Sequence, residues 1–316
     1  MQRWRPDASL ATLKARAELN GSVRAFFCQR GVLEVETPIL SAHATVDRFI
    51  DSFQTRDGRW LQTSPEFAMK RLLAAGSGAI FQIARVFRLE EQGRHHNPEF
   101  TMLEWYRPGF SLHQLMDEVE ALMHLLVGND AAFERMSYRE AFVHYAGFDP
   151  HVSSAEQMRA AAIASDLVSS GDFAEETADF WLDLWMSRVV SPALGLSTPS
   201  FVYDFPASQS ALARIRHDQP PVAERFELFW RGIELANGFH ELADANEQRA
   251  RFEADQQYRS DAELVVPPYD AHLIAALDSG AFPDCSGVAL GLDRLLMLKL
   301  GLSELKQVLA FSADRA

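Results

Sequence analysis

The sequence is poor in cysteine, with only Cys28 and Cys285 among its 316 residues. Two cysteines this far apart form neither a CxxC pair nor a disulfide framework, and such a chain fits a reducing compartment. His95 and His96 are adjacent, but no thiolate or HxxxH spacing accompanies them. The sequence therefore argues against a disulfide-stabilised scaffold and against a transition-metal site.

Long apolar runs are also lacking. The first residues, MQRWRPDASL, contain no hydrophobic stretch like that of a secretory signal, and no later run approaches the length that crosses a bilayer. We therefore expect a cytoplasmic protein with no membrane partner. Of the 316 residues 47% are hydrophobic, so the chain is long enough to build one large domain with a substantial buried core.

Basic residues are fewer than acidic ones. The chain has 30 Lys and Arg against 44 Asp and Glu, which gives a formal charge of −14. Nucleic acids are bound largely through neutralised phosphates, so this balance disfavours tRNA as a partner, although a local basic patch would be enough to overcome it. A basic protein partner would instead be attracted.

The region from Ile80 to Arg107 contains two runs whose side chains alternate between two faces. The first run places on one face Gln82, Ala84, Val86, Arg88 and Glu90. The second run places on one face Phe100, Met102, Glu104 and Tyr106. Because the turn formers of Glu91 to Pro98 separate the runs, we expect an antiparallel hairpin with a long loop.

Arg88 and Glu90 in this hairpin suit the formation of an adenylate. A guanidinium can bind phosphate and carboxylate oxygens together while a substrate carboxylate attacks the α-phosphate of ATP. Phe100 is placed to stack on a purine. Taken singly, each residue fits equally well a half-buried hairpin with surface ion pairs, so only the combination indicates this chemistry.

Two segments outside the hairpin are predicted to be helical. Leu19, Val23, Phe26 and Phe27 form an apolar stripe at helical spacing, which Gly31 can end. Residues 153–190 are predicted to be a mostly helical insertion without any recognisable chemical grouping. Proline and glycine are frequent from Pro192 to Pro221, which predicts an irregular stretch before the next strand.

The segment Phe226 to Leu242, FELFWRGIELANGFHEL, predicts a hairpin turning at Arg231-Gly232. Without a bulge, Leu228 would face Leu235, and Glu227 and Glu234 would lie on one face. Mg²⁺ commonly binds one or two carboxylates together with water and phosphate oxygens, so this pair is a candidate magnesium site for bound ATP. The alternative is an acidic strand that faces solvent.

Near the end of the chain, GVALGLDRLLML from Gly287 to Leu298 predicts a glycine-rich strand followed by a helix. Gly287 and Gly291 allow a nucleotide to approach the backbone closely. Arg294 falls in the first turn of the helix, where its charge adds to the positive helix end.

Together these motifs resemble class II aminoacyl-tRNA synthetases, in the version carried by lysyl-tRNA synthetases. VRAFFCQRGVLEVETPIL, with Pro38, resembles motif 1, the Ile80 hairpin resembles motif 2 and the Gly287 segment resembles motif 3. The resemblance implies an α+β fold with an antiparallel sheet flanked by helices. It also implies one catalytic domain over residues 1–316 and a homodimer built through the motif 1 helix.

The resemblance also implies roles for individual residues. The catalytic residues would be Arg88 and Arg294. ATP would be bound by Arg88, Leu89, Glu90, His96, Asn97, Phe100, Glu234, Leu235, Gly291 and Arg294. The metal ligands would be Glu227 and Glu234. The amino acid substrate would be bound by Ser64, Pro65, Glu66, Tyr106, Asn237, Glu241 and Ala289, with Glu241 receiving its side-chain ammonium.

Lysyl-tRNA synthetases carry an anticodon-binding β-barrel before the motif 1 helix, whereas only a short segment precedes that helix here. A catalytic core without the barrel resembles the ligases that attach (R)-β-lysine to a lysine of bacterial elongation factor P. The expected reaction is therefore activation of lysine or (R)-β-lysine by ATP and transfer to elongation factor P. The alternatives are a truncated synthetase that acylates tRNA and a non-catalytic subunit that senses an amino acid.

Two positions depart from the pattern of the synthetases. Ala289 stands where they have glycine, and its methyl group would favour an amino group displaced by one carbon if it lines the pocket. Leu89 replaces a polar residue that the family commonly has between the arginine and the glutamate. We expect little effect from Leu89, because it is predicted on the opposite strand face.

Overall fold

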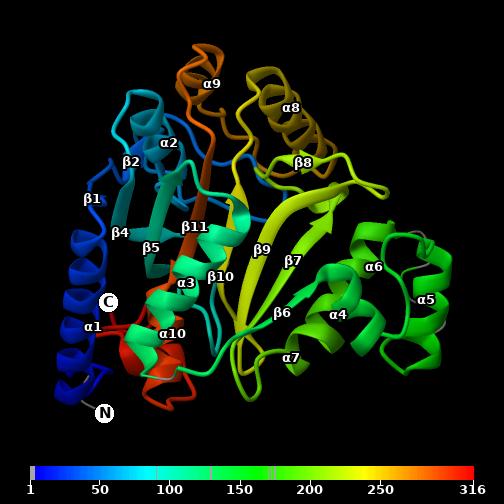
Figure 1. Cartoon of the computed structure of the whole chain (residues 1–316), viewed down its shortest axis with the longest axis horizontal. Coiled ribbons are helices and arrows are strands. Elements are labelled where there is room, and N and C mark those ends of the chain that lie inside the picture. Colours follow the sequence, from blue (N-terminus) through cyan, green and yellow to red (C-terminus); the bar gives the residue numbers. More distant parts are fainter. Residues whose placement is uncertain (1–3, 90, 129, 170, 172, 174–175) are drawn as a thin grey trace. The chain divides into compact units, whose positions relative to one another are not determined.

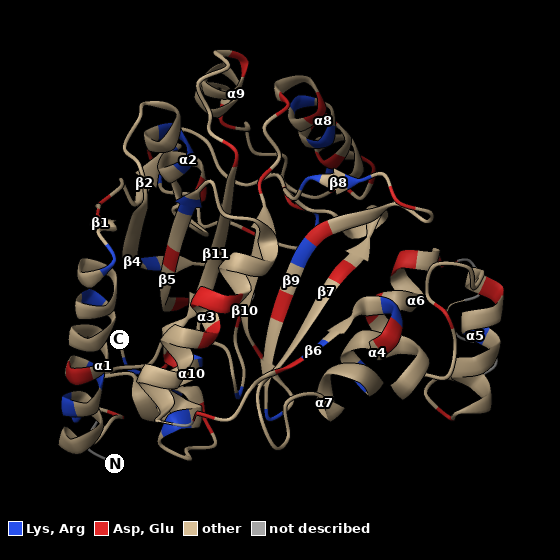
Figure 2. Ribbon diagram, in the orientation of Figure 1, with Lys and Arg blue, Asp and Glu red and all other residues tan. Residues whose placement is uncertain are grey.

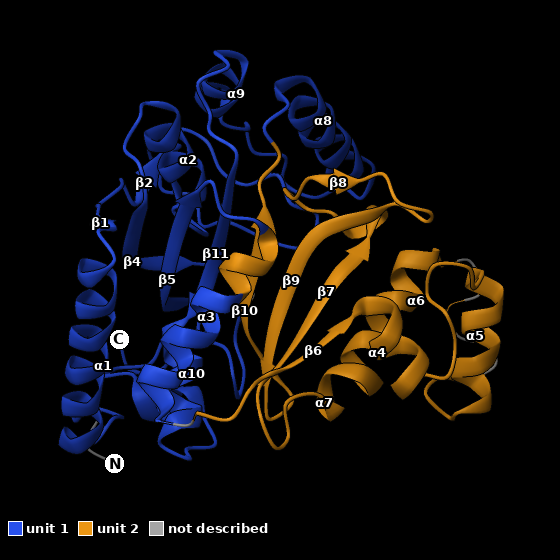
Figure 3. Cartoon of the chain, viewed as in Figure 1, with its two compact units in different colours: residues 1–111, 117–129, 243–316 blue, residues 112–116, 130–242 orange. Residues whose placement is uncertain are grey.

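The computed structural model describes residues 4–89, 91–128, 130–169, 171, 173 and 176–316 (Figure 1). The chain divides into two units (Figure 3). The first comprises Met1–Ser111, Asp117–Asn129 and Ala243–Ala316, and the second Leu112–Met116 and Asp130–Leu242. The single catalytic domain expected over residues 1–316 stays a prediction. No helix in the described part of the chain is long and apolar enough to cross a membrane.

The strands of the first unit are mainly antiparallel. In spatial order they are β1 (Leu33–Glu34), β4 (Ile80–Phe87), β5 (Glu99–Pro108) and β11 (Cys285–Gly291), and a separate pair is formed by β2 (Leu40–Ser41) and β3 (Trp60–Leu61). Among the described strands of this unit, only β1 and β4 run parallel. The helical elements are α1 (Leu10–Gln29), α2 (Glu66–Ala74), α8 (Ala245–Asp261), α9 (Ala271–Asp278), α10 (Leu292–Lys299) and the 3₁₀ turn η3 (Leu305–Val308). Helix α3 (Leu112–Val127) begins in the second unit and continues in the first.

Helix α1 confirms the predicted amphipathic helix. Ser9 caps its start by accepting the Thr12 backbone N–H, which satisfies one of the unpaired donors of the first turn. Its buried side chains include the predicted apolar stripe, and Phe27 stacks on Phe81 of β4 with ring centroids 4.6 Å apart. Gly31, with a φ of 66°, follows its end. The stripe therefore anchors α1 on the sheet of the first unit.

Strands β4 and β5 have the predicted pairing. Gln82 lies opposite Glu104, and Val86 lies opposite Phe100. Since directly opposed residues point to the same side of a sheet, Phe100, Glu104 and Tyr106 share a face, as expected. Strand β11 continues this pattern on the other side of β5, with Ala289 opposite Glu104.

The second unit has its own, mainly antiparallel strands. In spatial order they are β10 (Ile233–His240), β9 (Val222–Trp230), β7 (Ser200–Pro206) and β6 (Glu134–Ser137), with the short β8 (Ile215–Arg216) on β9. In the part of this unit that the structure describes, β6 and β7 are the only parallel pair. The helical elements are α4 (Tyr138–Tyr145), α5 (Ala155–Ala164), α6 (Ala178–Trp185), the π-helix η1 (Met186–Val190), α7 (Ser191–Ala193) and the 3₁₀ turn η2 (Ala207–Gln209).

The predicted helical segment 153–190 contains α5, α6 and η1. These helices belong to the core of the second unit, because Trp181 and Trp185 of α6 are buried in one cluster with Phe142 of α4 and Phe205 of β7. Aromatic side chains of this size bury a large apolar area. The segment is therefore packed into the second unit rather than appended to it.

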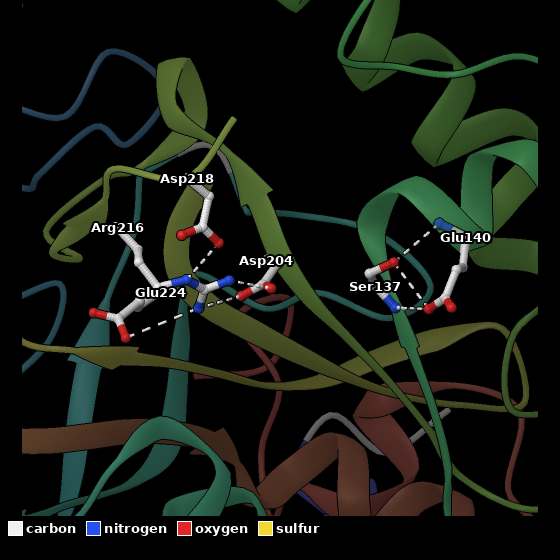
Figure 4. A network of polar contacts seen from close by, with 6 residues as sticks. All are labelled: Ser137, Glu140, Asp204, Arg216, Asp218 and Glu224. Carbon is white, nitrogen blue, oxygen red and sulfur yellow. Dashed lines mark hydrogen bonds and ion pairs between the residues drawn. The ribbon is translucent and has the colours of Figure 1, made fainter. Parts of the chain in front are cut away.

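The pairing of β7 with β9 is irregular at Asp204, which is held by charged side chains (Figure 4). Asp204 has a φ of 59°, which is unusual for a residue other than glycine. Arg216 binds both oxygens of Asp204, at 2.7 and 3.2 Å, and also binds Asp218 at 2.7 Å. Nearby, Ser137 and Glu140 form the capping box that starts α4. These contacts fix how β7 enters the loop that carries η2.

Candidate active site

Arg88 follows β4 at the start of the motif 2 loop. Its backbone N–H donates to Pro98 at 2.9 Å, which continues the hairpin, and its guanidinium lies 5.2 Å from the ring centroid of Phe100. Nη1 is 3.2 Å from Glu91, whereas Nε is buried and has no acceptor among the described residues. A guanidinium with one unused donor beside an aromatic ring is suited to bind an anion.

Arg294 lies in the first turn of α10, as predicted. Its Nε donates to the backbone oxygen of His95 at 3.3 Å, and its Nη2 is 4.0 Å from Glu91. His96 lies 3.5 Å from the same carboxylate. Glu91 therefore lies close to Arg88, Arg294 and His96. The sequence reasoning selected these three residues but not Glu91.

The other predicted nucleotide-binding residues of the loop vary in their surroundings. Asn97 donates to the backbone oxygen of Glu99 at 2.6 Å and accepts the Ala313 N–H at 3.1 Å, so its side chain holds the loop. Leu89 is 48% exposed, and its backbone N–H donates to Asp51 at 2.9 Å. Glu90 lies outside the described residues.

Asp293 connects the two predicted nucleotide elements. Strand β11 ends at Gly291, and Asp293 lies in the first turn of the helix α10 that follows. The Asp293 carboxylate accepts the backbone N–H of Thr101 at 2.8 Å. Its other oxygen is 2.5 Å from Arg16 of α1, which neutralises a carboxylate that is almost fully buried. Asp293 thus connects the first turn of α10, which carries Arg294, to β5 at the residue after Phe100. The sequence reasoning missed Asp293, although it directly precedes Arg294.

A buried carboxylate brings several predicted substrate residues together. Glu104 is 2% exposed and accepts hydrogen bonds of 2.7 Å from both the Tyr106 hydroxyl and the Ser64 hydroxyl. Ser64 also accepts the backbone N–H of Glu66 at 3.0 Å, at the start of α2, directly after Pro65. Sequence reasoning did not select Glu104, although the alternation placed it on the face of Tyr106.

Glu66 and Ala289 complete this part of the first unit. The Glu66 carboxylate is 2.6 Å from Lys70, an almost fully buried lysine one helical turn later. Ala289 is half-buried and packs with Phe100 on a small apolar cluster of Ala84, Val86 and Met102. Because it also lies opposite Glu104, its methyl group falls between the predicted nucleotide residues and the buried carboxylate.

The predicted carboxylate pair lies on β9 and β10 of the second unit. The turn at Arg231-Gly232 is confirmed, with both residues at positive φ. The predicted register is wrong beyond Glu234: a bulge at Leu235 pairs Leu228 with Ala236, and Glu227 with Asn237. Glu227 and Glu234 still share a face, because Glu234 lies opposite Phe229.

Glu227 is buried and has a raised pKa. Burial is the largest cause, and the charge of Glu234 adds to it, while Arg225 opposes it, so that the pKa of Glu227 reaches about 7. Figure 2 shows the charged positions that follow one another along β9. Leu235 is buried at the bulge, and Glu241 is buried where it pairs with Ala213.

The carboxylates of Glu227 and Glu234 suit a magnesium ion. Among the described residues no group of three or more His, Cys, Asp or Glu could hold a metal, so a closed protein cage is not formed there. Mg²⁺, however, needs only one or two carboxylates when phosphates and water supply its other oxygens. The raised pKa of Glu227 also indicates a carboxylate whose charge a cation would stabilise.

Comparison with known proteins identifies the family. Residues 1–315 match the family described as tRNA synthetases class II (D, K and N). The protein named elongation factor P--(R)-beta-lysine ligase of Yersinia enterocolitica is 50% identical, over 99% of this chain and 98% of the relative. The protein of the same name from Vibrio vulnificus is 52% identical, over 98% and 97%. The predicted fold class and family are thereby confirmed, and the chain belongs to the class II tRNA synthetases.

Proposed function

We propose that the protein activates (R)-β-lysine, or lysine, with ATP and transfers it to a lysine side chain of elongation factor P. The main support is that two relatives with this name match nearly the whole chain at 50% and 52% identity. The reaction places the protein among the ligases that convert ATP to AMP and pyrophosphate. We propose a cytoplasmic location, where its acceptor takes part in translation.

The arrangement around Arg88 supports the activation step. In this step a carboxylate oxygen of the amino acid attacks the α-phosphorus of ATP, the bond to the β-phosphate breaks, and pyrophosphate leaves. Arg88, with its unused Nε donor, would bind the α-phosphate and the attacking carboxylate. Arg294 would bind phosphate oxygens, and Phe100 would stack on the adenine. His96, Asn97 and Gly291 of the first unit would also contact the nucleotide, and for Leu235 of the second unit the resemblance implies the same role.

The buried carboxylate Glu104 supports a substrate that carries an additional ammonium group. An ammonium taken out of water needs a paired charge, and Glu104 is already held in one orientation by Tyr106 and Ser64. As the resemblance implies, Glu241 would receive the side-chain ammonium. The ammonium that pairs with Glu104 would therefore be the other amino group of the substrate, near Glu66. In the second step an acceptor amine attacks the carbonyl carbon of the adenylate, loses a proton to solvent, and AMP leaves.

Mg²⁺, bound by Glu227 and Glu234, would neutralise phosphate charge during activation. No side chain needs to become covalently attached to the substrate. The residues of the chain would act by holding the two reacting groups in line, which lowers the entropic part of the barrier. We also propose a homodimer formed through α1, and no use of tRNA as acceptor.

Two alternatives remain distinct from this proposal. Acylation of tRNA requires contact with a polyanion, which the charge of −14 disfavours. A sensing subunit requires no catalytic groups, whereas Arg88, Arg294, Glu227 and Glu234 are all present in this chain.

Amino-acid-dependent exchange of pyrophosphate into ATP tests the activation step. We expect exchange with (R)-β-lysine or lysine, and a loss of at least about a hundredfold in Arg88→Ala, the size expected when a guanidinium that stabilises the transition state is removed. Arg85→Ala is the matched control, because Arg85 lies on the other face of β4 and is exposed. A wild-type protein without exchange would support the sensing subunit.

A further inference from the structure

The guanidinium of Arg225, on β9, contacts four residues of the second unit. Its Nη2 binds Glu227, its Nε donates to Oδ1 of Asn237 at 3.2 Å, and its Nη1 donates to the backbone oxygen of Gln209 at 2.9 Å. Its guanidinium also lies 4.3 Å from the ring centroid of Phe205. A planar group with three partners and a stacking surface has one orientation, which a lysine ammonium could not reproduce.

Gln209 is in turn held by helix α6. Its side chain donates to Asp183 at 2.8 Å, and the preceding Ser208 donates to Asp179 at 2.6 Å. Asp179 and Asp183 are four residues apart on α6, so they project from the same side of the helix. The two bonds fix the turn η2, and with it the backbone oxygen that receives Arg225.

We infer, on the basis of the proposed function, that Arg225 is a positioning residue for binding of magnesium and ATP. It fixes the carboxylate of Glu227 and the amide of Asn237, which lie opposite each other on β9 and β10. Helix α6 sets the position of Arg225 through Asp183 and Gln209. The helical segment thereby supports the metal site of its own unit.

The geometry required by magnesium explains why this support matters. Mg²⁺ tolerates little departure from an octahedral arrangement, so a carboxylate that can rotate binds it less well. Residues that orient metal ligands commonly change affinity about 10–100-fold when they are replaced. Glu227 has no comparable freedom while Arg225 holds one of its oxygens.

The test is calorimetric titration of ATP at a series of Mg²⁺ concentrations, together with the Mg²⁺ dependence of pyrophosphate exchange. Arg225→Lys should raise the Mg²⁺ concentration for half-maximal ATP binding about tenfold. Asp183→Ala should raise it about fivefold, the effect of one lost hydrogen bond. Asp183→Asn should leave this Mg²⁺ concentration at the wild-type value, because asparagine keeps the oxygen that accepts from Gln209. Asp149→Asn, which alters the 2.6 Å pair with Arg139 in the same unit, is the control.

The double variant tests whether Asp183 acts through Arg225. In the Arg225→Lys background, Asp183→Ala should have no further effect, whereas independent sites would add. If Asp183→Ala lowers the thermal midpoint, Gln209→Ala replaces it as the test of α6. This variant removes the hydrogen bond to Asp183 and keeps the backbone oxygen that accepts from Arg225. Wild-type Mg²⁺ dependence in Arg225→Lys, or additive effects, would overturn the inference. If the wild-type protein binds no ATP, the proposed function itself fails.

Discussion

The carboxylate of Glu104 accepts a 2.7 Å hydrogen bond from the hydroxyl of Tyr106, two residues further along β5. We predict that Glu104→Gln lowers kcat/KM for the amino acid about a hundredfold or more, because a buried ammonium would lose its paired charge. The KM for ATP should change little. Steady-state exchange kinetics measure both values.

Glu99→Gln is the control for this change, since Glu99 lies at the exposed end of the same strand. Equal losses in the two variants would show that Glu104 does not contact the substrate.

The pair between Arg16 and Asp293 is expected to contribute to stability. Replacing Arg16 by Met leaves the Asp293 carboxylate buried without its counter-charge, which should reduce the free energy of unfolding by about 3 kcal/mol. Adding Asp293→Asn should recover part of this loss, because the buried charge is then removed. Urea unfolding of the wild type, both single variants and the double variant measures the coupling. Strictly additive losses would argue against the pair.

Ala289 is expected to influence which isomer is used. It lies opposite Glu104 and packs with Phe100, so its methyl group is on the face proposed for substrate. Ala289→Gly should shift the preference toward α-lysine by about 1–3 kcal/mol, the range for one methyl group. The ratio of kcat/KM for the two isomers is the measurement, and an unchanged ratio would remove this explanation of the departure from the synthetase pattern.

The stability contributed by Asp183 should depend on pH. Burial, with a smaller effect of Asp179, raises the pKa of Asp183 from 3.8 to about 6. Between these values the folded protein binds the proton more tightly than the unfolded chain, so the contribution grows as the pH falls from about 6 to about 4. The wild type should therefore gain stability over Asp183→Asn across this window, by less than about 3 kcal/mol because Asp183 is partly solvated.

Urea unfolding of both proteins at several pH values between 4 and 8 gives this difference directly. A difference that stays constant with pH would mean that Asp183 titrates normally in the folded protein.

Local patterns predicted the strands well where the alternation was uninterrupted. Within β4 and within β5 every second residue faces the same side, and the observed pairing of Val86 with Phe100 follows. The same reasoning failed after Glu234, because the bulge at Leu235 leaves no distinctive residue in the sequence. An alternating pattern fixes faces but does not reveal an extra residue in one strand.

Contacts between distant segments could not be predicted from one sequence. The bond from Asp293 to Thr101, the pair with Arg16 and the path from Asp183 to Arg225 all join residues far apart in the chain. Their residue types are common on solvated surfaces, so composition alone does not single them out. Only the tertiary structure shows that these side chains are held at the proposed sites.

The acceptor is the most direct test of the proposed function. The wild-type protein would be incubated with ATP, Mg²⁺ and (R)-β-lysine, with purified elongation factor P and total tRNA present together, and both acceptors analysed by mass spectrometry. We predict that elongation factor P gains the mass of one (R)-β-lysyl group while tRNA stays unmodified. Acylated tRNA beside unmodified elongation factor P would contradict the proposal and identify a truncated synthetase.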